Sequence, residues 1–257
     1  MLQAVFHVVG KPYAEIALFR ALVRRGDTVF DLGANTGQYT CLFCTLVGRE
    51  GVVHAFEPIP PTFAILKENT AGYAKRHHLF LNECAAGNSE GTVKMFVAEG
   101  RFTEASMVAH AAGARTAGYD CRVTTVDRYV REHDVRGVAL IKCDVEGAEL
   151  LAMQGAKALL GGKNPPILFL EAWSGWTKDF GYEPADLFSF LERVAGYRIY
   201  HLEKGALRPF AAGETLPPES FPDFLNFLCV VPAVHGERMR SLRRAGIDIR
   251  EKNAAEW

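Results

Sequence analysis

The sequence predicts an α/β protein with a doubly wound, largely parallel sheet and helices on both of its faces. Short apolar runs that suit buried parallel strands alternate along the chain with segments of helical periodicity, as in βαβ units. Four of these runs end in an acidic residue, namely Asp31, Glu57, Asp144 and Glu171. Because ligands of open α/β sheets bind beyond the carboxyl ends of the strands, these acids predict a binding edge.

Composition limits the classes of function to consider. The 257 residues are 49% hydrophobic and carry a formal net charge of −1, which suits one large domain with a substantial core. This near-neutral balance argues against nucleic acid as the main partner. The chain shows no apolar run of membrane-spanning length, no signal-peptide pattern and no disulfide framework among its 6 cysteines, so we expect a cytoplasmic protein without membrane contact.

The first predicted elements are a helix over 13–24, a strand over 29–32 and a helix over 38–46. A glycine-rich turn joins the strand to the second helix. Its two glycines allow a tight bend and a close approach of the backbone to a ligand. Asn35 and Thr36 can satisfy free backbone groups where the helix begins.

The residues of this turn restrict the ligand. A dinucleotide fingerprint needs glycines where this chain has Asn35 and Gln38, and the P-loop pattern is missing as well. Asp31 would repel a pyrophosphate and attract a cation. We therefore expect a positively charged or zwitterionic ligand that carries a nucleoside; the alternative is a turn without a ligand.

One C-x-x-C pair, Cys41 and Cys44, falls inside the helix that follows the turn. Zinc sites of this type use a second pair, which this chain lacks. We interpret the two cysteines as small helix side chains rather than as zinc ligands or redox groups.

The second strand, predicted over 52–57, ends in Glu57. Its separation from Gly33 is close to that at which a βαβ unit presents an acid to ribose hydroxyls, although a surface acid is the alternative. Pro58 and Ile59 would then lie against the base. A helix over 62–71 and a third strand that begins at Leu79 follow, and the small residues after that strand leave room for a flat ring.

The middle of the chain is less regular. We expect an extra strand over 91–97, a long loop over the site at 99–119 with room for a short helix, and a short extended piece over 123–126. Asp127 is expected to cap a helix that runs towards His133.

A central strand is predicted over 138–144. Its period of two puts Lys142 and Asp144 on one face, with Asp144 beside the glycine turn if the two strands are neighbours. Glu146 and Glu149 follow at once. Acids are favourable in the first turn of a helix, so Asp144 is the stronger functional candidate of the three.

The remaining elements are a helix over 150–160, a strand over 167–171, a helix over 184–195, a strand over 197–200 and a strand over 226–231. Trp173 and Trp176 follow the acid of the first of these strands and either wall a pocket or pack inside. Pro217 and Pro218 indicate a loop. The arginines of the C-terminal helical tail suit a solvated face.

Six blocks of this sequence resemble the FkbM family of S-adenosylmethionine-dependent methyltransferases. They are VFDLGANTGQYT, AFEPIPPTFAILKEN, ECAAGNSEGTV, VTTVDRYV, LIKCDVEGAELLAMQGA and PPILFLEAW, and the resemblance covers residues 13–232. It implies the class I methyltransferase (Rossmann-like) fold, with a seven-stranded sheet whose last strand, 226–231, is antiparallel. It also implies one domain over 1–257, with an N-terminal helix at 13–25, a core at 27–232 and a helical tail at 233–257.

The resemblance also implies how the cofactor is held. By similarity, S-adenosylmethionine, which leaves as S-adenosylhomocysteine, has its methionine part in the loop formed by Asp31, Gly33, Ala34, Asn35, Thr36 and Gly37. Glu57 would hold the ribose hydroxyls, and Ala85 and Ala86 would lie near the adenine. Asp144 would face the methionine end or the acceptor. Members of the family mostly methylate hydroxyls of sugars, polyketides and other small metabolites.

The expected catalytic group is a general base for a hydroxyl. Asp144 is the first candidate, Glu146 and Glu171 are alternates, and His110 is a further choice. A carboxylate is a poor base for an alcohol unless burial raises its pKa. Oxygen ligands at Asp144 could suit magnesium, but a single strand-end cluster does not support a metal site.

Two alternatives to a small-molecule O-methyltransferase stay open at this point. The first is an NAD-linked oxidoreductase on the same type of sheet, and the second is a non-catalytic module that binds a nucleoside. The segments 99–119 and 173–182 carry no readable acceptor signature, and the sequence leaves a homo-oligomer open.

Overall fold

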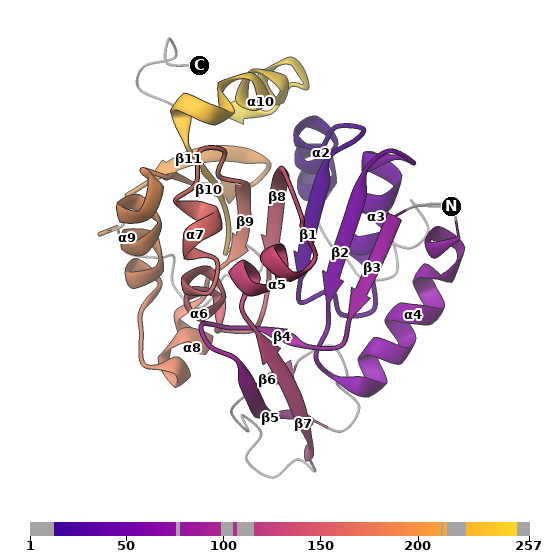
Figure 1. The fold of residues 1–257 in the computed structure, drawn as a ribbon. Helices are drawn as coiled ribbons and strands as arrows, with labels where there is room; N and C mark the ends of the chain where they lie inside the picture. Colours follow the sequence, from indigo (N-terminus) through magenta and orange to yellow (C-terminus); the bar gives the residue numbers. More distant parts are fainter. Residues whose placement is uncertain are drawn as a thin grey trace.

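The computed structural model describes residues 13–75, 78–98, 105–106, 116–211, 213–214 and 225–250. Within these residues the fold consists of a main sheet with helices on both faces and a smaller sheet at one of its ends (Figure 1). The strands of the main sheet are β1 (Thr28–Leu32), β2 (Val52–Phe56), β3 (His78–Asn82), β8 (Val138–Cys143), β9 (Ile167–Glu171), β10 (Arg198–Glu203), β11 (Ala206–Phe210), β12 (Asn226–Val230) and β13 (Asp248–Ile249).

The helices are α2 (Tyr13–Leu22), α3 (Gln38–Val47), α4 (Pro60–Ala74), α5 (Val126–Glu132), α6 (Glu149–Gln154), α7 (Lys157–Leu160), α8 (Ser174–Thr177), α9 (Pro184–Ala195) and α10 (Pro232–Arg244). A 3-10 turn, η1 (Lys178–Phe180), follows α8. None of the helices in the described ranges has the length and apolar character needed to cross a membrane.

The order of the main sheet is β13-β11-β10-β12-β9-β8-β1-β2-β3. The five strands from β9 to β3 are mutually parallel, whereas β12 runs antiparallel to both of its neighbours. The described sheet thus has nine strands rather than the expected seven. The edge hairpin β10–β11 and the short strand β13 extend it beyond β12.

Alternate residues of the central strands enter two separate cores. Val29 and Leu140 pack with α2, α3 and α10 on one face, and Phe30 and Ile141 pack with α5, α6, α7 and α9 on the other. This double burial explains why the strands read as continuous apolar runs in the sequence. Because β9, β8, β1, β2 and β3 are parallel, their carboxyl ends lie at one edge of the sheet.

The smaller sheet contains β4 (Ala85–Ala86), β7 (Thr116–Thr124), β5 (Gly91–Ala98) and β6 (Ala105–Ser106), in that order. It lies beyond the end of the main sheet to which the arrows of β2 and β3 point (Figure 1). The expectation of a loop over 99–119 is therefore wrong for the described residues 105–106 and 116–119. The remainder of that segment, including His110, lies outside the described residues.

The pairing of β5 with β7 explains this difference. The two strands form an antiparallel ladder that runs from the pair Gly91 and Val123 to the pair Ala98 and Thr116. Cys121 of β7 packs inside, whereas most of its neighbours are polar or small. Such a strand gains its stability from cross-strand partners, and its own sequence is a weak indication of it.

Two predictions about the helices also need correction. The single helix expected over 150–160 is broken into α6 and α7 at Gly155, where an added Cβ would lie 1.9 Å from the carbonyl oxygen of Gly87. Asp127 does not cap its own helix, because Thr125 Oγ1 accepts from the Arg128 N–H at 3.2 Å. Asp127 instead accepts from two backbone N–H groups of α7.

The C-terminal tail is not helical throughout. After α10 the chain forms β13, which pairs with β11 in parallel. Residues 251–257 and the predicted proline loop at 217–218 lie outside the described residues.

Candidate active site

A cavity of about 540 Å³ lies at the carboxyl ends of β1, β2, β8 and β9, next to the smaller sheet. This volume is in the range of small-molecule sites. Its wall includes the expected residues Gly33, Ala34, Asn35, Thr36, Glu57, Pro58, Ala85, Ala86, Asp144, Glu146 and Glu171. Asp31 and Gly37 do not line it.

The turn after β1 is shaped by its glycines. Gly33 has a φ of +76°, and a Cβ there would lie 1.8 Å from the carbonyl oxygen of Asp144. Gly37 has a φ of +92° and packs against α4 rather than the cavity. Asn35 Oδ1 accepts from the Thr36 N–H at 2.7 Å, which stabilises the positive φ of Asn35. The turn is thus held next to the end of β8.

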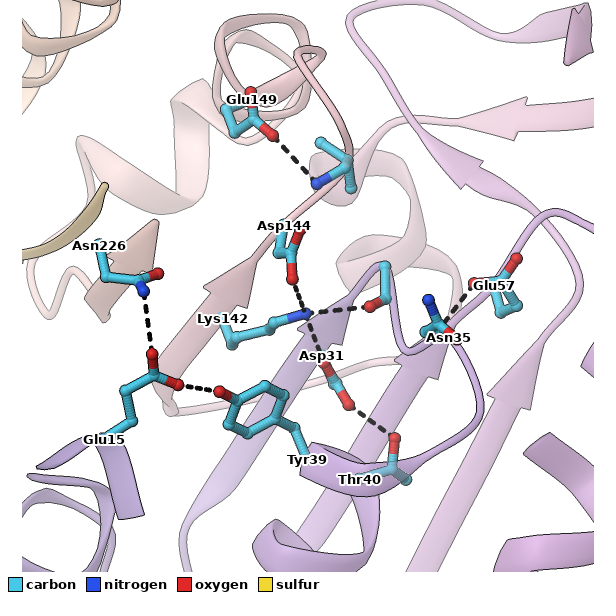
Figure 2. A network of polar contacts seen from close by, with 12 residues as sticks. Glu15, Asp31, Asn35, Tyr39, Thr40, Glu57, Lys142, Asp144, Glu149 and Asn226 are labelled. Atoms are coloured by element: carbon cyan, nitrogen blue, oxygen red, sulfur yellow. Dashed lines mark hydrogen bonds and ion pairs between the residues drawn. The ribbon is translucent and has the colours of Figure 1, made fainter. Parts of the chain in front are cut away.

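Lys142 is a buried ammonium at the floor of the cavity. Its Nζ lies 3.2 Å from Asp144 Oδ2 and 3.7 Å from Asp31 Oδ1, and it donates to the Gly33 carbonyl at 3.0 Å (Figure 2). Burial opposes its charge, but the carboxylates of Asp144 and Asp31 hold the pKa of Lys142 above its usual range. Lys142 therefore remains a cation and cannot act as a base at neutral pH.

The position of Asp31 corrects the direct role expected of it. Its side chain is fully buried, Oδ2 accepts from Thr40 Oγ1 at 2.6 Å, and Oδ1 faces Lys142 (Figure 2). Its negative charge is directed at a fixed cation of the protein rather than at a ligand in the cavity. Asp31 thus acts on the cavity through Lys142.

Glu57 lines the cavity with a side chain that the backbone holds in place. Oε2 accepts from the Asn35 N–H at 3.0 Å and Oε1 accepts from the Ile59 N–H at 2.9 Å. Burial outweighs these two hydrogen bonds and raises the pKa of Glu57 to about 7. The expectation that Ile59 lies against the nucleobase of the ligand is wrong, since Ile59 is fully buried in the core of the smaller sheet.

The three candidate catalytic residues Asp144, Glu146 and Glu171 also line this cavity. Glu149 holds the turn that carries Asp144 and Glu146, because its Oε1 accepts from the Val145 N–H at 3.0 Å (Figure 2) and from the Gly147 N–H at 3.2 Å. Burial raises the pKa of Glu149 to about 7. Glu149 has the structural role that its place in a helix start suggested.

Other expected residues do not reach the cavity. Trp173 and Trp176 contact each other edge-on at 5.3 Å and are not part of the wall. Burial raises the pKa of Cys41 to about 11 and that of Cys44 to about 12, so both thiols stay protonated. Among the described residues, no three His, Cys, Asp or Glu side chains gather as a metal site.

Sequence reasoning missed several residues of the wall. Tyr39 lines the cavity, and its ring centroid lies 5.2 Å from Lys142 Nζ. The smaller sheet contributes Thr92, Val93, Met95 and Val123. The predicted shared face of Lys142 and Asp144 was a usable indication for the lysine, whereas nothing local marked the strand pairing that adds the smaller sheet.

The charged groups of the cavity wall suit a cationic nucleoside such as S-adenosylmethionine. The described wall carries the carboxyl groups of Glu57, Glu90, Asp144, Glu146 and Glu171 and a single basic side chain, Lys142, which is already engaged by acids. Net negative charge with few competing cations favours a ligand of net positive charge.

A mostly parallel sheet of this order, with a cavity at its carboxyl edge, defines the class I methyltransferase fold. The Methyltransferase FkbM domain matches residues 31–199, and the chain belongs to that family. Over 75 residues the chain is 41% identical to the 31-O-demethyl-FK506 methyltransferase FkbM of Streptomyces tacrolimicus. The aligned stretch is 28% of this chain and 27% of the relative.

The fold is also similar to a crystal structure of the methyltransferase FkbM from Methylobacillus flagellatus KT. The TM-score is 0.55 at 18% sequence identity, and the similarity covers 88% of this chain and 49% of that chain. This chain therefore spans about a quarter of the curated relative that it matches and about half of the solved structure.

Proposed function

We propose that this chain transfers a methyl group from S-adenosylmethionine to a hydroxyl of a small-molecule acceptor. The observation that carries the proposal is the cavity wall, in which a backbone-held Glu57 and the carboxylate of Asp144 lie on the two sides of the glycine turn. Family membership supports the cofactor, and the name of the Streptomyces relative, 31-O-demethyl-FK506 methyltransferase, supports a hydroxyl acceptor.

Each part of the cofactor has candidate partners in the wall. Gly33, Ala34, Asn35 and Thr36 would hold the methionine part, Glu57 would accept from the ribose hydroxyls, and Pro58, Ala85 and Ala86 would flank the adenine. When bound, S-adenosylmethionine supplies an electrophilic methyl group on a good leaving group. The contribution of Asp31 and Gly37 would be indirect, through Lys142 and through the turn.

The protein would act mainly by positioning. Orientation of two bound reactants is worth about 7–11 kcal/mol, and a general base adds about 10²–10⁴-fold for a hydroxyl. Of the carboxylates that line the cavity, Asp144, Glu146 and Glu171 are our candidates for the group that takes the acceptor proton. Lys142 keeps the Asp144 carboxylate paired, which favours Glu146 or Glu171 as the base and Asp144 as an orienting group.

Calorimetric titration with S-adenosylhomocysteine, followed by transfer of labelled methyl groups to a panel of hydroxyl acceptors, tests the proposal. We expect saturable binding that Glu57→Ala sharply weakens, and label in the acceptor. Binding of NAD in place of S-adenosylhomocysteine would favour an oxidoreductase. Binding of S-adenosylhomocysteine without transfer to any acceptor would favour a nucleoside-binding module.

A further inference from the structure

A buried carboxylate outside the cavity connects three elements of the fold. Glu15 of α2 is 4% exposed, and both of its oxygens accept hydrogen bonds. One bond comes from the hydroxyl of Tyr39 in α3, and the other, of 2.9 Å, comes from Asn226 Nδ2 in β12 (Figure 2). A buried carboxylate is costly unless such bonds are made, so an apolar residue would be the simpler choice for this packing.

Both partners of Glu15 lead to the cavity. Tyr39 lines it, and Asn226 is the direct pairing partner of Glu171 between β12 and β9. Neither Glu15 nor Asn226 falls within the residues 31–199 that match the family. Segments on either side of the matched part therefore meet at the back of the site.

From Tyr39 the contacts continue to the floor of the cavity. The ring faces Lys142 Nζ at 5.2 Å from its centroid, and the same nitrogen pairs with Asp144 and donates to the Gly33 carbonyl. An aromatic face attracts an ammonium most strongly where water is excluded, and Lys142 is 3% exposed. The direction of the Tyr39 ring thus helps to fix Lys142.

We propose that Glu15 is a positioning residue for the cofactor pocket: it holds Tyr39 by its hydroxyl, so that the Tyr39 ring keeps Lys142 between Asp144 and the Gly33 carbonyl. The inference rests on the proposed function for the identity of the ligand. The network itself is independent of that identity.

Removal of a single hydroxyl tests the inference. Tyr39→Phe keeps the ring but loses the bond to Glu15, and the matched control Tyr197→Phe loses a buried hydroxyl bond of 2.7 Å to the Pro166 carbonyl, at a residue that does not line the cavity. Both variants should lower the melting temperature. Only Tyr39→Phe should lower the affinity for S-adenosylhomocysteine measured by calorimetry. We expect a loss of about tenfold, the scale of one hydrogen bond to a charged group.

A rescue experiment tests Glu15 itself. In Glu15→Gln the charged acceptor becomes a neutral amide, and with the Asn226 amide as it stands an oxygen that accepts from Tyr39 turns the new NH₂ group towards the NH₂ group of Asn226. Because a neutral acceptor holds the Tyr39 hydroxyl less tightly than a carboxylate, we expect a similar loss of affinity. Adding Asn226→Asp supplies an acceptor at that point and conserves the total charge. The double variant should recover affinity to within about twofold of the wild type.

The outcomes separate the two proposals. If the wild-type chain does not bind S-adenosylhomocysteine, the proposed function fails. If it does bind and both Tyr39→Phe and Glu15→Gln retain wild-type affinity, the positioning role is overturned. A double variant that stays as weak as Glu15→Gln while circular dichroism shows it folded also contradicts the inference. If Glu15→Gln does not fold, Tyr39→Phe still decides.

Discussion

The ammonium nitrogen of Lys142 lies 3.2 Å from a carboxylate oxygen of Asp144, and both side chains line the same cavity. On its other side the same ammonium faces the fully buried Asp31 at 3.7 Å. One cation is therefore shared between an acid at the cavity and an acid inside the protein. This arrangement couples the stability of the sheet to the geometry of the site.

Replacement of this cation should be severe. In Lys142→Met the buried carboxylate of Asp31 loses its counter-charge, and breaking a buried pair in this way costs about 3–5 kcal/mol. Urea unfolding measures the loss. The control Lys94→Met removes an ammonium from an exposed pair with Asp120 and should leave the free energy of unfolding nearly unchanged. Equal effects of the two substitutions would contradict the role assigned to Lys142.

The close approach of Gly33 to β8 gives a second test. Gly33→Ala and Gly26→Ala both place a side chain at a positive φ, of +76° and +85°, so the backbone strain is similar. Only at Gly33 does the new Cβ meet an atom, the Asp144 carbonyl oxygen at 1.8 Å, whereas the space beside Gly26 is open. Gly33→Ala should lose about 1–3 kcal/mol more stability than Gly26→Ala. Gly33→Ala should also lower the affinity for S-adenosylhomocysteine, whereas Gly26→Ala should leave that affinity unchanged.

The raised pKa of Glu57 predicts a pH dependence of binding. Burial shifts the pKa from 4.5 to about 7, so the native state holds this proton more tightly than the unfolded chain, and ionising Glu57 costs stability as the pH rises through this range. Ribose hydroxyls donate to the ionised form. Affinity for S-adenosylhomocysteine should therefore rise between pH 6 and 8 by up to about tenfold per pH unit below the pKa, and then level off.

The matched variant for this titration is Glu57→Gln. It keeps the shape of the side chain but has no proton to lose, so calorimetry should give a weaker and flatter profile. A wild-type affinity that does not change across this pH range, or a variant that retains the slope, would assign the dependence to another group.

The bonds of Asp127 to α7 predict a stability effect without an effect on the site. The carboxylate accepts from Ala158 and Leu159 N–H groups at 2.7 and 2.9 Å, so Asp127→Ala leaves two helix-terminal donors without their acceptor. We expect a loss of about 1–2 kcal/mol in urea unfolding and unchanged binding of S-adenosylhomocysteine. Asp120→Ala, at an exposed carboxylate, serves as the control. Changed binding in Asp127→Ala would show that α7 is coupled to the cavity.

The central strands could be predicted from the sequence to within a residue or two. In β1, β2, β8 and β9 both faces are buried, an acid lies within one residue of the carboxyl end and a turn follows, so local residues carry the information. The edge hairpin β10–β11 and the strand β7 could not be predicted in full. In β11 the residue Pro209 is atypical of a strand, and most residues of β7 are polar or small, so these strands depend on partners across the sheet.

The sequence by itself determined the alternation of strands and helices, the glycine turn after β1 and the acids at the strand ends, because each depends on neighbouring residues. Only the tertiary structure decided which acid faces the cavity. Asp31 and Asp144 look alike in sequence, yet strand order buries the first behind Lys142 and leaves the second at the wall. Likewise, Glu15 and Asn226 meet because α2 and β12 pack at the same end of the core, a contact that no local pattern encodes.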